Sequence, residues 1–236
     1  MFNAKKLPAP PSNRERPPAL EAGSYPARLV QLVNIGVQTQ RPYKGEEKPP
    51  RLMMRLTYEL LDEFLKDDEG EDRLDKPRWL SEEFTFMSLQ QDLAKSTKRY
   101  YALDAEDTAD GDWTQLVGRP CMLTIVTEKD KRPGNDTIYE KIASVSAMRP
   151  KEAAKAPELV NPPLIWDFYN PDIEVFKSFP DWIQIKIKDA VDFEGSALAE
   201  ALGGMSRKEV GEGSQKTKKA PVAASEEASE GDDEAW

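Results

Sequence analysis

The stretch RLMMRLTYEL, which runs from Arg51 to Leu60, alternates two kinds of side chain at every second residue. One face is apolar or aromatic throughout and consists of Leu52, Met54, Leu56, Tyr58 and Leu60. The other face consists of Arg51, Met53, Arg55 and Thr57. Successive side chains of a strand point to opposite faces of a sheet, so this pattern predicts a half-buried β-strand.

Similar signals on both sides of this stretch predict further strands. Residues 25–36 (YPARLVQLVNIG) are apolar and β-branched and end at a glycine, and residues 79–87 place two phenylalanines on one face. Residues 121–127 (CMLTIVT) predict a fourth strand, and a Pro-Gly-Asn-Asp turn leads into a fifth over 138–148. Residues 90–103 contain neither glycine nor proline and predict a helix. The acidic block 62–75 predicts a long loop.

The resulting order, three strands, a helix and two more strands, is that of the OB-fold, a partly open barrel that binds oligonucleotides. An SH3-like barrel or a generic α+β sheet would share part of this order. We therefore predict a mainly β domain over residues 23–150, a five-stranded OB-fold-like barrel with one helix between its third and fourth strands.

The regions on either side of this domain differ from it in composition. Residues 1–22 are rich in proline and predict a flexible arm. Residues 151–202 begin with a linker, continue with an aromatic cluster and predict a short helical extension packed on the barrel or on a second protomer, so a homodimer is possible. Residues 203–236 contain almost no large apolar residue and predict a disordered acidic tail.

Composition argues against most enzyme classes. The chain has no histidine and a single cysteine, Cys121, so it lacks the commonest general base and can form neither an internal disulfide nor a metal site with several thiolates. We expect no catalytic residue, no metal site and no cofactor, although 43 acidic residues leave a carboxylate–metal nuclease open. With no apolar run of membrane-spanning length and no secretory signal, we expect a cytoplasmic protein that binds no membrane.

The formal net charge of −10 is concentrated in two segments. Residues 226–236 hold six acidic residues and no basic one, and residues 62–75 hold eight acidic residues against two basic ones. The rest of the chain is therefore slightly positive. Such a chain can carry a basic binding groove on an acidic body.

Cationic and aromatic residues gather in the first loop and the second strand, where they suit a single-stranded nucleic acid. The candidates there are Arg41, Tyr43, Lys44, Lys48, Arg51 and Arg55. Cations can follow the phosphates, and a ring that stacks on a base contributes about 1–3 kcal/mol. Further candidates are Trp79, Lys129, Lys131, Arg132 and Tyr139. The alternative is an ordinary solvated strand face and a hairpin tip kept soluble by its lysines.

The end of the chain, EEASEGDDEAW, combines acidic residues with a terminal aromatic ring. The candidate partner-binding residues are Glu230, Asp232, Asp233, Glu234 and Trp236. An acidic string that ends in a ring suits a basic pocket on a partner, and it also mimics a single strand. The alternative is a solubilising tail.

The chain resembles the single-stranded DNA-binding proteins of tailed bacteriophages in three stretches. They are residues 25–36, residues 116–121 (LVGRPC) with the strand that follows, and the acidic tail with its aromatic end. The resemblance implies an OB-fold, sequence-independent binding of single-stranded DNA, and a tail that competes with DNA for the groove. It also implies that the tail recruits replication and recombination proteins such as a polymerase, a helicase-primase or a nuclease. This chain ends in tryptophan, where phenylalanine is more usual.

From these observations we predict a non-enzymatic protein that protects single-stranded DNA during phage DNA replication and recombination, in the cytoplasm of the bacterial host cell. The first alternative is a protein-interaction or virion-assembly module that binds no nucleic acid. The second is a carboxylate–metal nuclease, which needs acidic residues clustered in one cleft.

Overall fold

Strand β1 (Gly23–Gln38) is the centre of a six-stranded sheet. The structure, a computed structural model, describes residues 17–130 and 136–203. The other strands are β2 (Arg51–Lys66), β3 (Asp72–Thr85), β4 (Pro120–Lys129), β5 (Ile138–Ala147) and β6 (Leu164–Trp166). The helices are α1 (Lys95–Leu103), α2 (Pro150–Ala153), α3 (Ile173–Ser178), α4 (Asp181–Lys188) and α5 (Ala197–Ala201), with a 3₁₀ turn, η2 (Trp113–Leu116).

The strands lie in the order β3-β2-β1-β4-β5, each pair antiparallel, and β6 joins β1 in parallel. Residues 23–28 of β1 pair with β4, whereas residues 31–33 pair with β6, so two strands share the length of β1. Two register shifts against β2 mark irregularities in the ladder, which bend a strand and increase its twist. The prediction of a mainly β fold with a helix between the third and fourth strands is confirmed, and the sheet has six strands instead of five.

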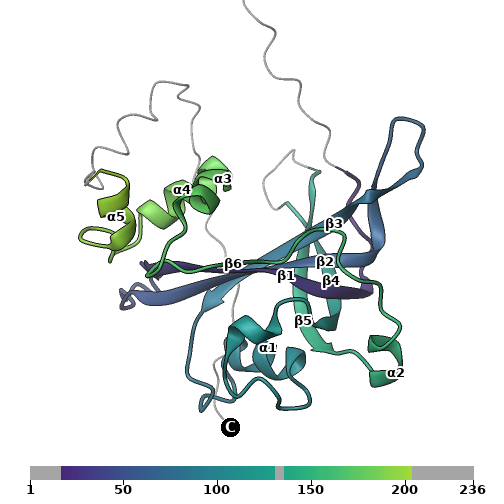
Figure 1. Cartoon of the computed structure of the whole chain (residues 1–236), viewed down its shortest axis with the longest axis horizontal. Coiled ribbons are helices and arrows are strands. Elements are labelled where there is room, and N and C mark those ends of the chain that lie inside the picture. Colours follow the sequence, from purple (N-terminus) through teal and green to yellow (C-terminus); the bar gives the residue numbers. More distant parts are fainter. Residues whose placement is uncertain (1–16, 131–135, 204–236) are drawn as a thin grey trace, which may run out of the picture.

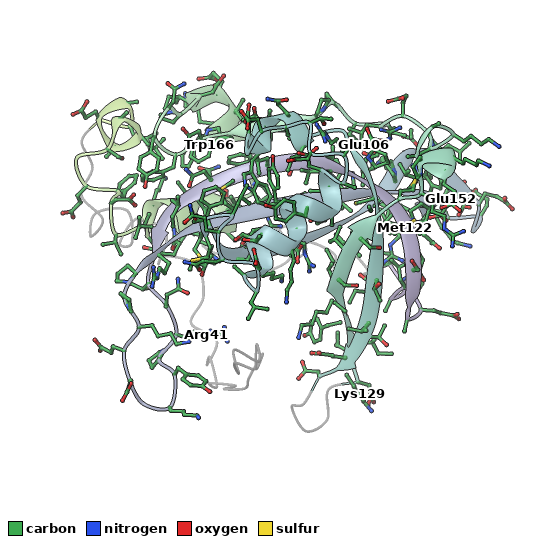
Figure 2. The ribbon with its side chains drawn as sticks, turned by 90° about the horizontal axis from the view of Figure 1, so that it is seen from below. Arg41, Glu106, Met122, Lys129, Glu152 and Trp166 are labelled. Carbon is green, nitrogen blue, oxygen red and sulfur yellow. The ribbon has the colours of Figure 1, made fainter. Side chains whose placement is uncertain are left out.

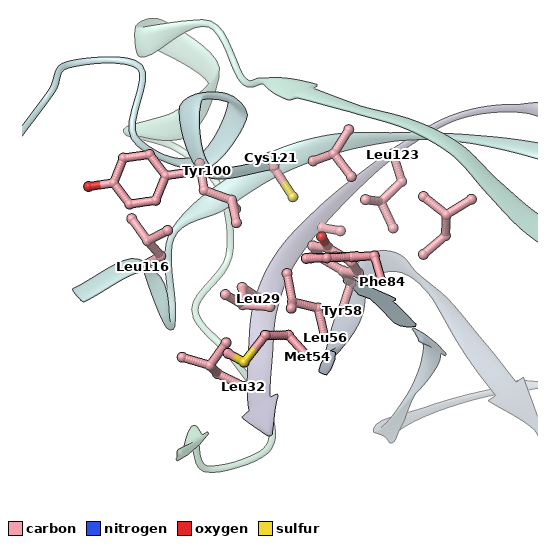
Figure 3. Packing of buried hydrophobic residues seen from close by; sticks show 14 of the residues in the cluster. Leu29, Leu32, Met54, Leu56, Tyr58, Phe84, Tyr100, Leu116, Cys121 and Leu123 are labelled. Carbon is pink, nitrogen blue, oxygen red and sulfur yellow. The ribbon is translucent and has the colours of Figure 1, made fainter. Parts of the chain in front are cut away.

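Two apolar cores lie on opposite faces of the sheet. The first holds the alternating residues of β2, such as Leu56 and Tyr58, together with Leu123 of β4 and Tyr100 of α1 (Figure 3). The second packs Val33 and Ile35 of β1 against aromatic and aliphatic residues of the C-terminal helices. Figure 1 shows α1 below the sheet, and α3, α4 and α5 above one end of it.

The sheet does not close into a barrel, because no ladder joins β3 to β5 in the described residues. Side chains join these two edges instead. Arg78 of β3 donates a 2.6 Å hydrogen bond to Glu140 of β5, and the same carboxylate oxygen accepts from the backbone N–H of Leu20, also at 2.6 Å. Leu20 is buried in the first core, so the segment before β1 fills the opening between the edge strands.

Two details of the predicted order need correction. The acidic block 62–75 is not a long loop, since β2 continues to Lys66 and β3 begins at Asp72. The ladder continues, with two register shifts, and all acidic side chains of this block except the half-buried Glu63 are exposed, so they do not oppose pairing. Asp67 accepts backbone hydrogen bonds from Glu69 and Glu71 in the turn. Strand β6 was not predicted, because it has only three residues and depends on β1 for its hydrogen bonds. Among the described residues, no helix is long and apolar enough to cross a membrane.

Candidate nucleic-acid interface

The loop between β1 and β2, residues 39–50, carries most of the first group of candidate residues and has a tight turn at its tip. We call it the cationic hairpin. Tyr43 and Glu46 exchange two backbone hydrogen bonds of 2.9 Å, and the two residues between them have φ values of 50° for Lys44 and 85° for Gly45. Positive φ at both central positions defines a type I′ turn, in which glycine is favoured. The sequence Lys-Gly therefore fixes a narrow tip.

The side chains of this tip form a ring with two cations beside it. The Tyr43 ring is 53% exposed, and the Nζ atoms of Lys48 and Lys44 lie 4.6 and 5.2 Å from its centroid. These distances are within the range of cation–π attraction. Both lysines are exposed, and so are Arg41 and Arg51 at the base of the hairpin. None of these four cations takes part in an ion pair with another described residue. The hairpin thus presents an exposed ring beside positive charges that form no ion pair with another described residue, next to the acidic Glu46 and Glu47.

Arg55 was expected on an open strand face, but helix α4 covers it. Its guanidinium lies 4.7 Å from the centre of the Trp182 ring of α4, and its Nη1 is 3.0 Å from the Glu83 carboxylate. Lys186 of α4 contacts the other oxygen of the same carboxylate. Burial lowers the pKa of the Arg55 guanidinium, and the charge of Glu83 partly offsets this effect. Arg55 therefore holds α4 on the sheet, and α4 covers it.

A cleft of about 480 Å³ separates α4 from the base of the cationic hairpin. Arg41 lines it on the hairpin side, Met53 lies on β2, and Trp182, Ile185 and Lys186 line it on the side of α4. Thr39 and Asp189 also line it. The cleft thus combines an exposed indole with cations on both sides. The residues of α4 were missed as candidates, although Trp182 and Lys186, four residues apart, share a helix face outside the buried Ile183–Ile187 stripe.

Residues 155–163, which we call the crossing segment, cover another part of the same sheet face. Arg28 and Glu59 lie opposite each other in the β1–β2 ladder. Arg28 donates hydrogen bonds to the carbonyls of residues 156 and 157, and Glu59 accepts from the backbone N–H groups of residues 160 and 161. Trp79 of β3 donates its indole N–H to Glu59 at 3.0 Å. Glu59 lies eight positions along β2 from Arg51, roughly 27 Å of strand, so Trp79 is remote from the cationic hairpin.

The β4–β5 hairpin carries the last described candidates, Lys129 and Tyr139. Lys129 is ion-paired with Asp136 at 2.6 Å, and the Tyr139 hydroxyl donates to Asp130 at 3.1 Å. Figure 2 shows that this hairpin, labelled at Lys129, and the cationic hairpin, labelled at Arg41, project from the same side of the molecule but are well separated. Lys131 and Arg132 lie outside the described residues, as do the five tail candidates Glu230, Asp232, Asp233, Glu234 and Trp236.

The candidate residues that the structure describes therefore form one assembled group and two separate positions. The assembled group joins the cationic hairpin with the cleft beside α4, and the separate positions are Trp79 and the β4–β5 hairpin. No group of three or more Asp, Glu or Cys side chains within residues 17–130 and 136–203 has a geometry that could hold a metal ion. Neither a known protein family nor a curated protein matches this chain.

Proposed function

We propose that this protein binds single-stranded DNA without sequence preference, on a sheet that is an open form of the OB-fold. The strand order β3-β2-β1-β4-β5 with a helix between β3 and β4 supports the fold assignment. In OB-folds the loops after the first and fourth strands border the binding site. Here the cationic hairpin and the described ends of β4 and β5 project from the same side (Figure 2).

The observation that carries this proposal is the tip of the cationic hairpin. An exposed tyrosine with two lysines close to its ring offers a single strand a ring for a base and positive charges for the neighbouring phosphates. Arg41 and Arg51 extend the positive charge along the hairpin. None of these contacts reads the edge of a base, so binding would be independent of sequence.

The biological role belongs to the same proposal. The resemblance to phage single-stranded DNA-binding proteins supports protection of single strands during phage DNA replication and recombination in a bacterial cytoplasm. The acidic, tryptophan-ended tail would recruit the replication and recombination proteins. A protein-interaction module is the second candidate, because the crossing segment and α4 cover much of the face of β2 that an OB-fold usually offers to DNA.

The first test removes two charges from the hairpin tip. We expect the double variant Lys44→Gln, Lys48→Gln to bind oligo-dT more weakly and to lose about 1.4 from the slope of log affinity against log salt, about 0.7 for each phosphate contact. Fluorescence anisotropy at a series of salt concentrations measures both effects. The matched control is Lys151→Gln with Lys155→Gln, which removes two exposed charges near α2. An equal loss in both double variants would assign the effect to net charge and contradict the proposed site.

A further inference from the structure

The outer face of α4 carries an exposed tryptophan that packing alone does not explain. Trp182 is 52% exposed, whereas Ile183 and Ile187 on the buried stripe of the same helix are 8% and 0% exposed. The two isoleucines, Phe176 of α3 and Phe179 just after it belong to the second core, so the helix does not need an indole on its outer side. A large ring left half in solvent beside a cleft is typical of a binding surface.

The ring is also held in place from below. The Arg55 guanidinium lies 4.7 Å from its centroid, and Glu83 fixes that guanidinium through a 3.0 Å hydrogen bond. Arg55 and Glu83 have side chains that are only 15% and 18% exposed, so this support is shielded from water. A ring that is already ordered loses little conformational entropy when a ligand stacks on it.

The chemistry around the ring selects the kind of ligand. Arg41 brings positive charge to the cleft that Trp182 lines, and Lys186 and Arg55 share the single carboxylate of Glu83, so this group also keeps a net positive charge. The lysines of the cationic hairpin lie beyond the cleft. Asp189 also lines the cleft and would repel an anion placed next to it. A flat, uncharged group against the indole with anionic groups toward Arg41 fits this pattern, and a nucleotide base with its flanking phosphates has that form.

We infer that Trp182 is a base-stacking residue of the DNA site, so that the C-terminal extension contributes one side of the site and the cationic hairpin the other. This inference rests on the proposed function. One nucleotide would stack on the indole while its phosphates face Arg41, and the strand would then continue toward Tyr43. The extension would thus cover the face of β2 that usually binds DNA in an OB-fold, and it would supply Trp182 as a stacking residue instead.

The test compares Trp182→Ala and Trp182→Phe with the wild type, using oligo-dT and an abasic oligodeoxynucleotide of the same length. If the indole stacks on a base, Trp182→Ala should weaken binding of oligo-dT by about tenfold or more and leave binding of the abasic strand unchanged. Trp182→Phe should retain most of the affinity for oligo-dT. The matched control is Tyr101→Ala, which removes a 49% exposed ring from α1 and should change neither affinity.

Each other outcome has a definite meaning. If Trp182→Ala is folded, as judged by circular dichroism, and binds oligo-dT like the wild type, the stacking role is overturned while the proposed function stands. If both variants lose affinity for both strands equally, Trp182 only holds α4 in place, and the inference is again overturned. If the wild type binds neither strand at low salt, the proposed function fails, and this inference fails with it.

Discussion

Gly36 shows how much one residue of β1 contributes to docking of the C-terminal extension. It has a φ of 76°, and a Cβ atom there would lie 2.9 Å from the Cβ of Ala190 and 3.2 Å from the ring of Phe168. The next residue, Val37, donates its N–H to Asp192 at 2.9 Å. The other carboxylate oxygen of Asp192 accepts a hydrogen bond from the Tyr169 hydroxyl. Burial and this hydrogen bond raise the pKa of Tyr169 to about 12. The positive φ of Gly36 and the close approach of the Ala190 and Phe168 side chains therefore require glycine at this position.

We expect Gly36→Ala to destabilise the protein by about 2–4 kcal/mol, because it adds backbone strain to overpacking. Gly45→Ala is the matched control, since Gly45 also has a positive φ but nothing lies within 4 Å of the added Cβ. It should cost only about 1 kcal/mol, the strain alone. Urea unfolding of both variants measures the difference, and equal losses would show that close packing at Gly36 adds nothing.

Some features of single residues could be predicted from the sequence, and others could not. The alternation in residues 51–60 correctly separated the core face of β2 from its other face. The exposure of Tyr43 also followed from its position between a proline and a Lys-Gly pair. The surroundings of Arg55 did not follow, because periodicity gives the face of a strand but not the segment, more than 100 residues later, that covers this face.

At the scale of the elements, a buried ion pair attaches α1 to β3. Arg99 of α1 donates two hydrogen bonds, of 2.8 and 3.0 Å, to the two carboxylate oxygens of Glu82. Tyr58 of β2 and Lys95 also contact this carboxylate, at 3.0 and 2.9 Å. Burial acts to raise the pKa of Glu82, but the hydrogen bonds and charges of Arg99 and Lys95 outweigh it and lower the pKa.

We expect Glu82→Gln to destabilise the protein by about 3–5 kcal/mol, because Arg99 would remain buried without its counter-charge. Since the folded-state pKa of Glu82 is lowered, its contribution is complete above the ordinary value near 4.5 and is lost as the pH falls through the lower folded value. Urea unfolding between pH 6 and pH 3 measures this dependence. The variant should lose part of it, whereas Glu152→Gln, at an exposed position of α2, should match the wild type.

A variant at Glu82 that keeps both its stability and its full acid sensitivity would contradict this account of the ion pair. The role of Asp104 can be separated from it. The pKa of the Asp104 carboxyl is also lowered, since hydrogen bonds from residues 108, 109 and 119 outweigh its burial. Some acid sensitivity should therefore remain in Glu82→Gln.

Local patterns predicted most of the larger elements, because the strands from β1 to β5 and helix α1 each bury a regular set of apolar side chains. The crossing segment and β6 were beyond such patterns. The crossing segment bonds to Arg28 and Glu59, which are 128 and 101 residues away from their partners in the chain, and β6 pairs with residues 31–33 of β1. No local period signals a contact of this kind.

For the molecule as a whole, charge is divided between the two ends of β2. The strand begins at the cationic hairpin and ends in the acidic β2–β3 hairpin, residues 62–75. An anionic strand would therefore be attracted to one end and repelled from the other, despite the net charge of −10. The sequence predicted this division, but only the packing of α4 beside the hairpin indicates where the two sides of the proposed site meet.

The central claim is binding of single-stranded DNA, and one titration tests it most directly. Labelled oligo-dT and a duplex of the same length are titrated with the full chain at about 50 and about 200 mM salt, with fluorescence anisotropy as the readout. We predict tight binding of the single strand at low salt, clearly weaker binding at high salt, and a marked preference over the duplex. Absence of binding to the single strand at low salt, or weak binding that does not change with salt, would contradict the account and favour a protein-interaction module.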